Sequence, residues 1–217
     1  MMHRYFGFDL DGTLVKTNGC FQDASIESCR QYGITLTPEQ FNGFNSRGGH
    51  LHEYLIQRGV SDVVIKDIQA MRNEMHLLLL KCDAQWIDGA IDVLEQLRAK
   101  GKQKIPIITN STRELVTVIH NKLQLFDYCD CIITPDLAES DYKPKPDGLH
   151  LAARNCANGE PVRWTYIGDK PFDHMAAHAA GWEPWQIGNE PLLNDPTAQP
   201  VRRIERLEEI LEMSSAS

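Results

Sequence analysis

The sequence has no C-x-x-C pair, no excess of basic residues and no long hydrophobic run. Its six cysteines stand at irregular spacings, so we predict reduced thiols in a cytoplasmic protein rather than a disulfide framework. Lysine and arginine number 22 against 30 aspartates and glutamates, which argues against a nucleic-acid-binding protein. The longest apolar runs, such as 77–80, are far shorter than a membrane span, and no secretory signal is visible at the start.

The chain has an ordinary globular composition over 217 residues, with 42% hydrophobic and 24% charged residues. That length suits one large domain, or one domain that carries a smaller inserted one. Short apolar segments alternate with helical ones along most of the chain, which predicts an α/β fold with a parallel sheet. The expected strands are 4–8, 105–108, 131–134, 164–167 and 184–187, and the expected helices are 88–100, 112–124 and 171–180.

One region breaks this alternation, because residues 16–81 contain no segment typical of a strand. Thr37 and Gln40 stand at the spacing of a capping box, and a longer helical segment follows Ser61. We therefore predict a small all-helical cap, residues 16–84, inserted after the first strand of a core made of residues 1–15 and 85–217. Ligands of open α/β sheets bind beyond the carboxyl ends of the strands, so the cap is expected there.

Residues able to carry chemistry follow four of the expected strands. In chain order they are Asp9 and Asp11, then Thr109 and Asn110, then Lys143, and finally Asp169 and Asp173. If the strands are parallel, all four groups meet at one edge of the sheet. That convergence is stronger evidence for a site than any one of the short motifs.

Such a cluster suits phosphate chemistry. Carboxylates at close quarters repel one another unless a cation balances their charge, and oxygen ligands of this kind suit Mg²⁺. One carboxylate can attack phosphorus and a second can move a proton. Ser111 and Glu114 have capping-box spacing, so Thr109 is expected to precede a helix amino terminus that can bind phosphate oxygens. Lys143 would add a cation that balances charge on the nucleophile and on the phosphoryl group.

Four motifs in this chain, DLDGT, IITN, KPKP and GDKPFD, resemble those of the haloacid dehalogenase superfamily of phosphohydrolases, in the same order and at similar spacing. The resemblance covers about residues 1–15 and 85–190. The helical insertion and the stretch WIDGAIDVLEQLRAKG resemble the phosphoglycolate phosphatase-like branch. The resemblance implies a Rossmann-like core with a helical cap, and Mg²⁺-dependent phosphatase activity.

The resemblance also implies roles for the aspartates of the first and last motifs. Asp9 matches the nucleophile that becomes an aspartyl-phosphate. Asp11 matches the general acid and base, which protonates the leaving alcohol and then activates water. Asp9, the backbone carbonyl of Asp11, and Asp169 match the Mg²⁺ ligands.

The remaining matches concern the phosphoryl group and its charge. Thr109 and Asn110 match phosphoryl-binding residues. Lys143 matches the lysine that stabilises charge at the reacting centre, where it also binds phosphate. Asp173 matches a carboxylate that holds this lysine or a metal-bound water.

Three further residues depart from the motifs or lie outside them. Lys170 stands where many relatives have a small hydroxyl residue; it can contact substrate phosphate, pair with an aspartate, or point to solvent, which is the orientation we expect. Lys145 is expected at the surface, at the start of the following helix. Arg47, in a glycine-flanked stretch of the cap, is a candidate for binding a substrate carboxylate or phosphate.

The function predicted from these features is hydrolysis of a small phosphomonoester, phosphoglycolate-like or a sugar phosphate, with Mg²⁺ as cofactor. The expected partner is a small phosphorylated metabolite, with no nucleic acid and no membrane. Phosphoglucomutase-type transfer shares every core motif and stays open, and a non-catalytic regulatory module is a third hypothesis. Asp11 and Asp169 argue against dehalogenation, which needs neither a metal nor a second carboxylate.

Overall fold

The computed structural model describes residues 3–17, 19–45, 50–101, 103–137, 140–157, 162–188 and 201–214. The chain divides into two compact units, one made of residues 1–16 and 85–217 and the other of residues 17–84. We call them the α/β unit and the helical unit and describe each by itself. Among the described residues, no helix combines the length and the apolar character needed to cross a membrane.

A six-stranded, fully parallel sheet forms the centre of the α/β unit, with strand order β5-β4-β1-β6-β7-β8. All five expected strands lie in it, which confirms the predicted α/β class with a Rossmann-like parallel sheet. The strand β8 was not predicted, because it is only three residues long and two of those are arginines. The bounds are β1 His3–Phe8, β4 Pro106–Ile108, β5 Cys131–Ile133, β6 Val162–Gly168, β7 Glu183–Ile187 and β8 Arg202–Ile204.

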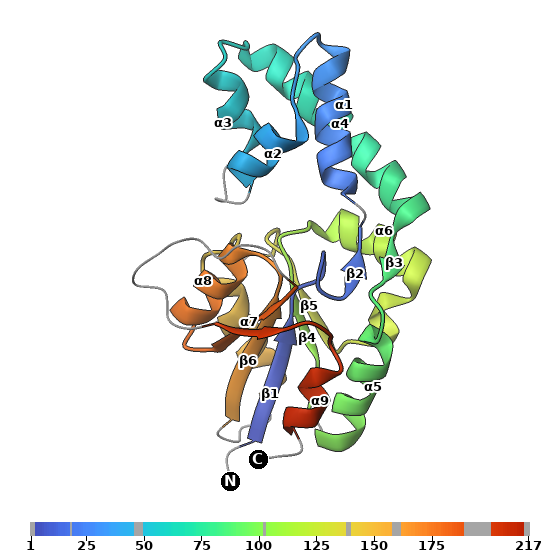
Figure 1. Cartoon of the computed structure of the whole chain (residues 1–217), viewed down its shortest axis with the longest axis vertical. Coiled ribbons are helices and arrows are strands. Elements are labelled where there is room, and N and C mark those ends of the chain that lie inside the picture. Colours follow the sequence, from blue (N-terminus) through green and yellow to red (C-terminus); the bar gives the residue numbers. More distant parts are fainter. Residues whose placement is uncertain are drawn as a thin grey trace. The chain divides into compact units, whose positions relative to one another are not determined.

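Helices flank this sheet, as right-handed crossovers between parallel strands require (Figure 1). The helices α7 and α8 share one hydrophobic cluster with β4, β5 and β6, so they cover the same face. The helices α5 and α9 contact each other and lie on the other side of the sheet (Figure 1). The bounds are α5 Ala90–Gly101, α6 Arg113–Leu123, the short 3₁₀ helix η1 Leu125–Asp127, α7 Asp147–Cys156, α8 Pro171–Ala179 and α9 Glu209–Ser214.

The sheet core explains why the strands read as continuous apolar runs. Phe6 and Phe8 of β1 share one face of the sheet and Tyr5 lies on the other, and all three are buried because helices cover both faces. Trp185 of β7 is fully buried, and its ring lies 5.8 Å from that of Phe6. Burial of such large aromatic side chains supplies much of the hydrophobic stabilisation of the unit.

A two-stranded antiparallel ribbon stands where the chain leaves and re-enters the α/β unit. Its strands are β2 Val15–Lys16 and β3 Gln85–Trp86, and Val15 pairs with Trp86. The backbone N–H of Ile87 also donates to the carbonyl of Leu14 at 2.9 Å. The sequence pattern did not predict this ribbon, because each strand has only two residues and so shows no detectable periodicity.

The helical unit consists of α1 Cys20–Gln31, α2 Pro38–Asn45, α3 Leu51–Ile56 and α4 Asp62–Asp83. Its core gathers apolar side chains from all four helices, among them Phe41, Leu55 and Ile65. The predicted capping box is present: the N–H of Gln40 donates to Thr37 Oγ1 at 3.2 Å, and the N–H of Thr37 donates to Gln40 Oε1 at 3.0 Å. The all-helical character predicted for this insertion is thereby confirmed over its described residues.

Candidate active site

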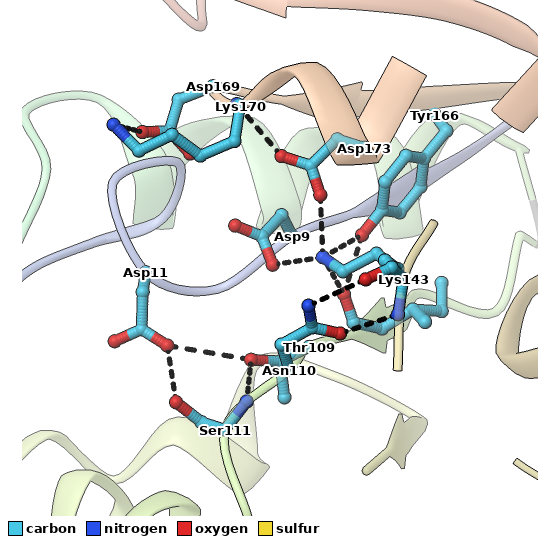
Figure 2. Close-up of polar contacts among 11 residues, drawn as sticks. Asp9, Asp11, Thr109, Asn110, Ser111, Lys143, Tyr166, Asp169, Lys170 and Asp173 are labelled. Carbon is cyan, nitrogen blue, oxygen red and sulfur yellow. Dashed lines mark hydrogen bonds and ion pairs between the residues drawn. The ribbon is translucent and has the colours of Figure 1, made fainter. Parts of the chain in front are cut away.

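The polar residues of the four motifs lie together at the carboxyl edge of the sheet (Figure 2). Strands β4, β1 and β6 are direct neighbours, and each is followed at once by a motif residue, namely Thr109, Asp9 and Asp169. The neighbouring strand β5 sends its following loop, with Lys143, to the same place. The parallel topology therefore explains how residues more than 130 positions apart, such as Asp9 and Lys143, come into contact.

Lys143 is the centre of the cluster. Its ammonium group lies 2.6 Å from Asp9 Oδ1 and 2.7 Å from Asp173 Oδ1, and it donates to the carbonyl of Ile108 at 3.0 Å. The hydroxyl of Tyr166 lies 2.9 Å from the same nitrogen. Only 2% of the Lys143 side chain is exposed, so these contacts are made away from water. A buried ammonium of this kind is tolerable only because two carboxylates and two neutral oxygens surround it.

Three carboxylates line one small space beside this lysine. Oxygen atoms of Asp9, Asp169 and Asp173 lie within 4.8 Å of one another, and all three residues are buried. Asp169 Oδ1 is buried and has no hydrogen-bond partner within the described part of the chain. Gly12 takes a positive φ of 82°, and a Cβ atom there would lie 2.5 Å from Asp169 Oδ2. The glycine of the first motif thus leaves room for the Asp169 carboxylate.

Burial dominates the electrostatics of the site. It raises the pKa of Asp9 well above its ordinary value, against the opposing effect of Lys143. Burial, followed by repulsion from Asp173, raises the pKa of Asp169 to about 6. Burial lowers the pKa of Lys143, but Asp173 and Asp9 together outweigh it and raise the pKa overall. The site holds more negative charge than its lysines neutralise, and a divalent cation would relieve that imbalance.

The carboxylate of Asp11 lies apart from this space. It accepts a hydrogen bond of 2.7 Å from Ser111 Oγ and a longer one of 3.5 Å from Thr109 Oγ1 (Figure 2). Burial raises the pKa of Asp11, against these hydrogen bonds. The expected capping box of Ser111 and Glu114 is wrong: α6 begins at Arg113, and Ser111 uses its hydroxyl on Asp11 instead of on the helix.

The side chain of Asn110 forms hydrogen bonds with the backbone of Lys143. Its side-chain amide donates to the carbonyl of Lys143 at 3.1 Å, and its Oδ1 accepts from the N–H of Lys143 at 2.8 Å. This reciprocal pair ties the β4 strand end to the loop that carries the lysine. The Asn110 side chain therefore fixes the backbone of Lys143.

The expected solvent orientation of Lys170 is wrong. Its ammonium lies 3.1 Å from Asp169 Oδ2, and 29% of the side chain is exposed. Its backbone N–H donates to Asp173 Oδ2 at 2.9 Å, which caps the start of α8. Lys145, by contrast, is exposed and pairs with Asp141 on the surface.

The sequence reasoning missed Tyr166 as a member of the site. Its hydroxyl donates to the carbonyl of Ile108 at 2.5 Å and contacts Lys143, and the side chain is fully buried. A tyrosine within an otherwise apolar strand is a usable signal, because a buried hydroxyl needs a partner. Tyr166 contacts the Lys143 ammonium from the side opposite Asp9 (Figure 2).

Arg47, the predicted substrate contact of the cap, lies outside the described residues. A cavity of about 260 Å³ lies within the helical unit, lined by Phe21, His50, His52, Arg72 and neighbouring residues. His76 stands near it, since its ring centroid lies 5.3 Å from that of Phe21. Polar and aromatic side chains thus surround this cavity.

The chain combines an acidic site at the carboxyl edge of a parallel sheet with an all-helical insertion after the first strand. The model of the haloacid dehalogenase-like hydrolases matches residues 7–185. The chain therefore belongs to the haloacid dehalogenase-like hydrolase family, as its motifs predicted.

Curated relatives of this chain are phosphatases, and the chain is an enzyme of that class. It is 30% identical to phosphoglycolate phosphatase of Caulobacter vibrioides over 182 residues, which cover 80% of this chain and 74% of that one. It is 27% identical to the pyrophosphatase PpaX of Anoxybacillus flavithermus over 94% of this chain and 93% of that one. The two relatives differ in substrate, so the similarity fixes the class of reaction and leaves the substrate open.

Solved structures share the fold at lower sequence identity. A haloacid dehalogenase-like family hydrolase of Streptococcus pneumoniae superposes with a TM-score of 0.74 at 21% identity, covering 98% of both chains. The hydrolase YfnB of Bacillus subtilis, solved bound to magnesium and described as showing interdomain movement, gives a TM-score of 0.71 at 18% identity, covering 99% of both chains.

Proposed function

We propose that this protein is a Mg²⁺-dependent phosphatase that hydrolyses a small phosphomonoester through an aspartyl-phosphate on Asp9. The observation that carries the proposal is the buried ion pair of Asp9 with Lys143, beside two further carboxylates, at the edge of the sheet where ligands bind. Lys143 engages Oδ1 of Asp9, which leaves Oδ2 as the oxygen for attack on phosphorus.

The donor set fits a hard divalent cation. Asp9 and Asp169 would hold Mg²⁺ together with the backbone carbonyl of Asp11. Asp173 would hold Lys143 in place through their ion pair. The unpartnered Oδ1 of Asp169 is a ligand atom of the type that Mg²⁺ prefers. When bound, the ion would neutralise phosphate charge and orient the phosphoryl group.

The residues of this chain divide the reaction into two balanced steps. In the first, Asp9 attacks phosphorus, the bond to the ester oxygen breaks, and Asp11 gives its proton to the leaving alkoxide. In the second, Asp11 takes a proton from water, which attacks the aspartyl-phosphate, releasing phosphate and the Asp9 carboxylate. The raised pKa of Asp11 favours the protonated form needed at the start.

Lys143 and Thr109 have supporting roles in this scheme. The ammonium of Lys143 balances the charge that develops as phosphorus is transferred, because it is already desolvated and held by four oxygens. Thr109 lies at the end of β4 with its hydroxyl toward Asp11, and the N–H of Ser111 donates to that hydroxyl at 2.9 Å. Thr109 is thus held where a phosphoryl oxygen would arrive.

The helical unit, residues 17–84, would act as a cap that selects the substrate and excludes water from the first step. Its cavity supports this role, since Arg72 and two histidines are among the lining residues and can recognise a charged substrate. The interdomain movement described for YfnB is consistent with closure in a relative of the same fold. A screen of phosphorylated metabolites, with and without Mg²⁺, would identify the substrate.

The central test is the Asp9→Asn variant with an aryl phosphate as substrate. We expect phosphate release to fall roughly 10³-fold or more while circular dichroism and the melting curve keep a folded protein. Asp141→Asn, at an exposed acidic residue of the same unit, serves as the control and should retain activity. Full activity of Asp9→Asn, or full activity in excess chelator, would contradict the proposal. Isomerisation of a sugar phosphate without phosphate release would instead show a phosphomutase.

A further inference from the structure

Two cysteines meet on the α/β unit, at the end of the sheet away from the acidic site. Cys131 is the first residue of β5 and Cys156 is the last residue of α7, and their Sγ atoms lie 3.1 Å apart. Lys143 and the motif aspartates follow the carboxyl ends of the strands, whereas Cys131 pairs with Pro106 at the amino end of β4. The pair is therefore separate from the catalytic machinery.

The surroundings make the two sulfur atoms unequal. Cys156 is fully buried, whereas Cys131 is partly exposed and can be reached from solvent. A hydrogen bond from the Cys131 thiol, together with the nearby cation of Lys104, lowers the pKa of Cys156. The Lys104 ammonium lies next to it, 3.4 Å from the carbonyl of Asn155. The same contact with Cys156, followed by burial, raises the pKa of Cys131.

We propose that Cys131 and Cys156 are an oxidisable dithiol that closes to a disulfide when the enzyme meets a low-molecular-weight disulfide such as oxidised glutathione. The partly exposed Cys131 passes its thiol proton to the Cys156 thiolate, 3.1 Å away, as its sulfur attacks one sulfur of glutathione disulfide. One glutathione leaves as its thiolate and takes that proton from Cys156. The Cys156 thiolate then attacks Cys131 Sγ in the mixed disulfide and releases the second glutathione. The two cysteines lose two protons and two electrons in total, and one glutathione disulfide is reduced to two thiols.

The bond would join two elements that already pack together, so it needs little movement of the backbone. The helix α7 covers β4 and β5, and Ile133, Leu149 and Ala152 share one buried cluster between them. The closed loop runs over 25 positions from Cys131 to Cys156 and contains Lys143. Oxidation would therefore restrict the unfolded chain and tie down the segment that carries the lysine, which raises the melting temperature.

The test begins with the full-length protein, incubated with oxidised and with reduced glutathione and then alkylated. Intact mass should show the loss of two hydrogens and four alkylated cysteines out of six after oxidation. Trypsin should give a cross-linked pair of peptides, 123–154 with 155–163, which separates after reduction. Six alkylated cysteines, or only mixed disulfides with glutathione, would overturn the proposal.

Peptide 123–154 also contains Cys129, so a matched pair of variants is required. Cys129→Ser should keep the cross-link, and Cys131→Ser should lose it and remain as a glutathione adduct at most. A cross-link that survives in Cys131→Ser and disappears in Cys129→Ser would overturn the assignment. The wild-type melting temperature should rise on oxidation, and Cys82→Ser, at an exposed cysteine of the helical unit, should show the same rise.

Discussion

The two lysines of the acidic site lie in contrasting surroundings. Lys143 is 2% exposed in its side chain and contacts two carboxylates, a backbone carbonyl and a tyrosine hydroxyl. Lys170 is 29% exposed and forms an ion pair with Asp169 at 3.1 Å. The first lysine is buried in the protein interior, whereas the second is partly exposed to water.

This contrast divides the site into a fixed part and an exchangeable part. On the Lys143 side, the charge of Asp9 and Asp173 is balanced by the protein itself. On the Asp169 side, one carboxylate oxygen has no hydrogen-bond partner among the described residues and the other pairs with the partly exposed Lys170. We therefore expect a cation that enters the site to displace Lys170 from Asp169, while Lys143 keeps its contacts with Asp9 and Asp173.

The largest effect is expected from Lys143→Met. Removal of the ammonium leaves Asp9 and Asp173 buried without their cation, which costs about 3–5 kcal/mol of stability in comparable buried pairs. Phosphatase activity should fall by roughly 10³-fold, since the charge at the reacting centre is lost as well. Thermal melting and turnover of an aryl phosphate measure the two effects. Lys145→Met, at the exposed lysine of the same loop, is the control, and equal behaviour of both variants would refute the fixed role of Lys143.

Asp169→Asn should act on the exchangeable part alone. The neutral amide removes a metal ligand and also relieves the repulsion from Asp173, so Mg²⁺ affinity should drop by tenfold or more while the metal-depleted protein becomes more stable. Isothermal titration with MgCl₂ measures the Mg²⁺ affinity, and thermal melting in chelator measures the stability of the metal-depleted protein. A variant that is less stable in chelator than the wild type would show that Asp169 supports the fold rather than the metal.

Sequence patterns predicted the sheet well, because helices that cover both faces leave buried parallel strands as plain apolar runs. They also predicted which residues meet at the carboxyl edge of the sheet, since parallel strands carry their following residues to one side. The contact of Lys143 with Asp9 across 134 positions is an example. The roles assigned to these residues rest on the family resemblance and await the variants described above.

The details that the sequence did not predict depend on which partner each polar side chain contacts in the folded protein. The spacing of residues along the sequence does not contain that information. Ser111 has the spacing of a capping residue in the sequence, yet α6 begins two residues later at Arg113, and the Ser111 hydroxyl donates to the buried carboxylate of Asp11. Lys170 was expected in solvent because lysine usually is, but the uncompensated charge of Asp169 attracts it. The hydroxyl of Tyr166 reaches Lys143 only because β6 and the loop after β5 meet in space.

A smaller effect is expected from Lys170→Ser, which tests whether this lysine competes with the metal. Removal of a cation from Asp169 should strengthen Mg²⁺ binding several-fold, because like charges near the site no longer oppose entry of the ion. Isothermal titration with MgCl₂ in the absence of substrate measures the Mg²⁺ affinity, with Lys145→Ser as the matched control. Weaker Mg²⁺ binding in Lys170→Ser would mean that the lysine helps to build the metal site.

The smallest expected effect is the pH dependence of the stabilisation by Mg²⁺, which tests the Asp169 side of the site. Burial and Asp173 raise the pKa of Asp169 to about 6 in the folded protein, above the value of about 4 in an unfolded chain. The folded state thus binds the proton more tightly, and without metal the stability that Asp169 contributes below pH 4 is lost as the pH rises through 6. Mg²⁺ needs the ionised carboxylate, so the rise in melting temperature on adding MgCl₂ should be a few degrees larger at pH 7.5 than at pH 5. That difference should become smaller in Asp169→Asn, whereas the same metal-induced shift at both pH values in the wild type would place the titrating ligand elsewhere.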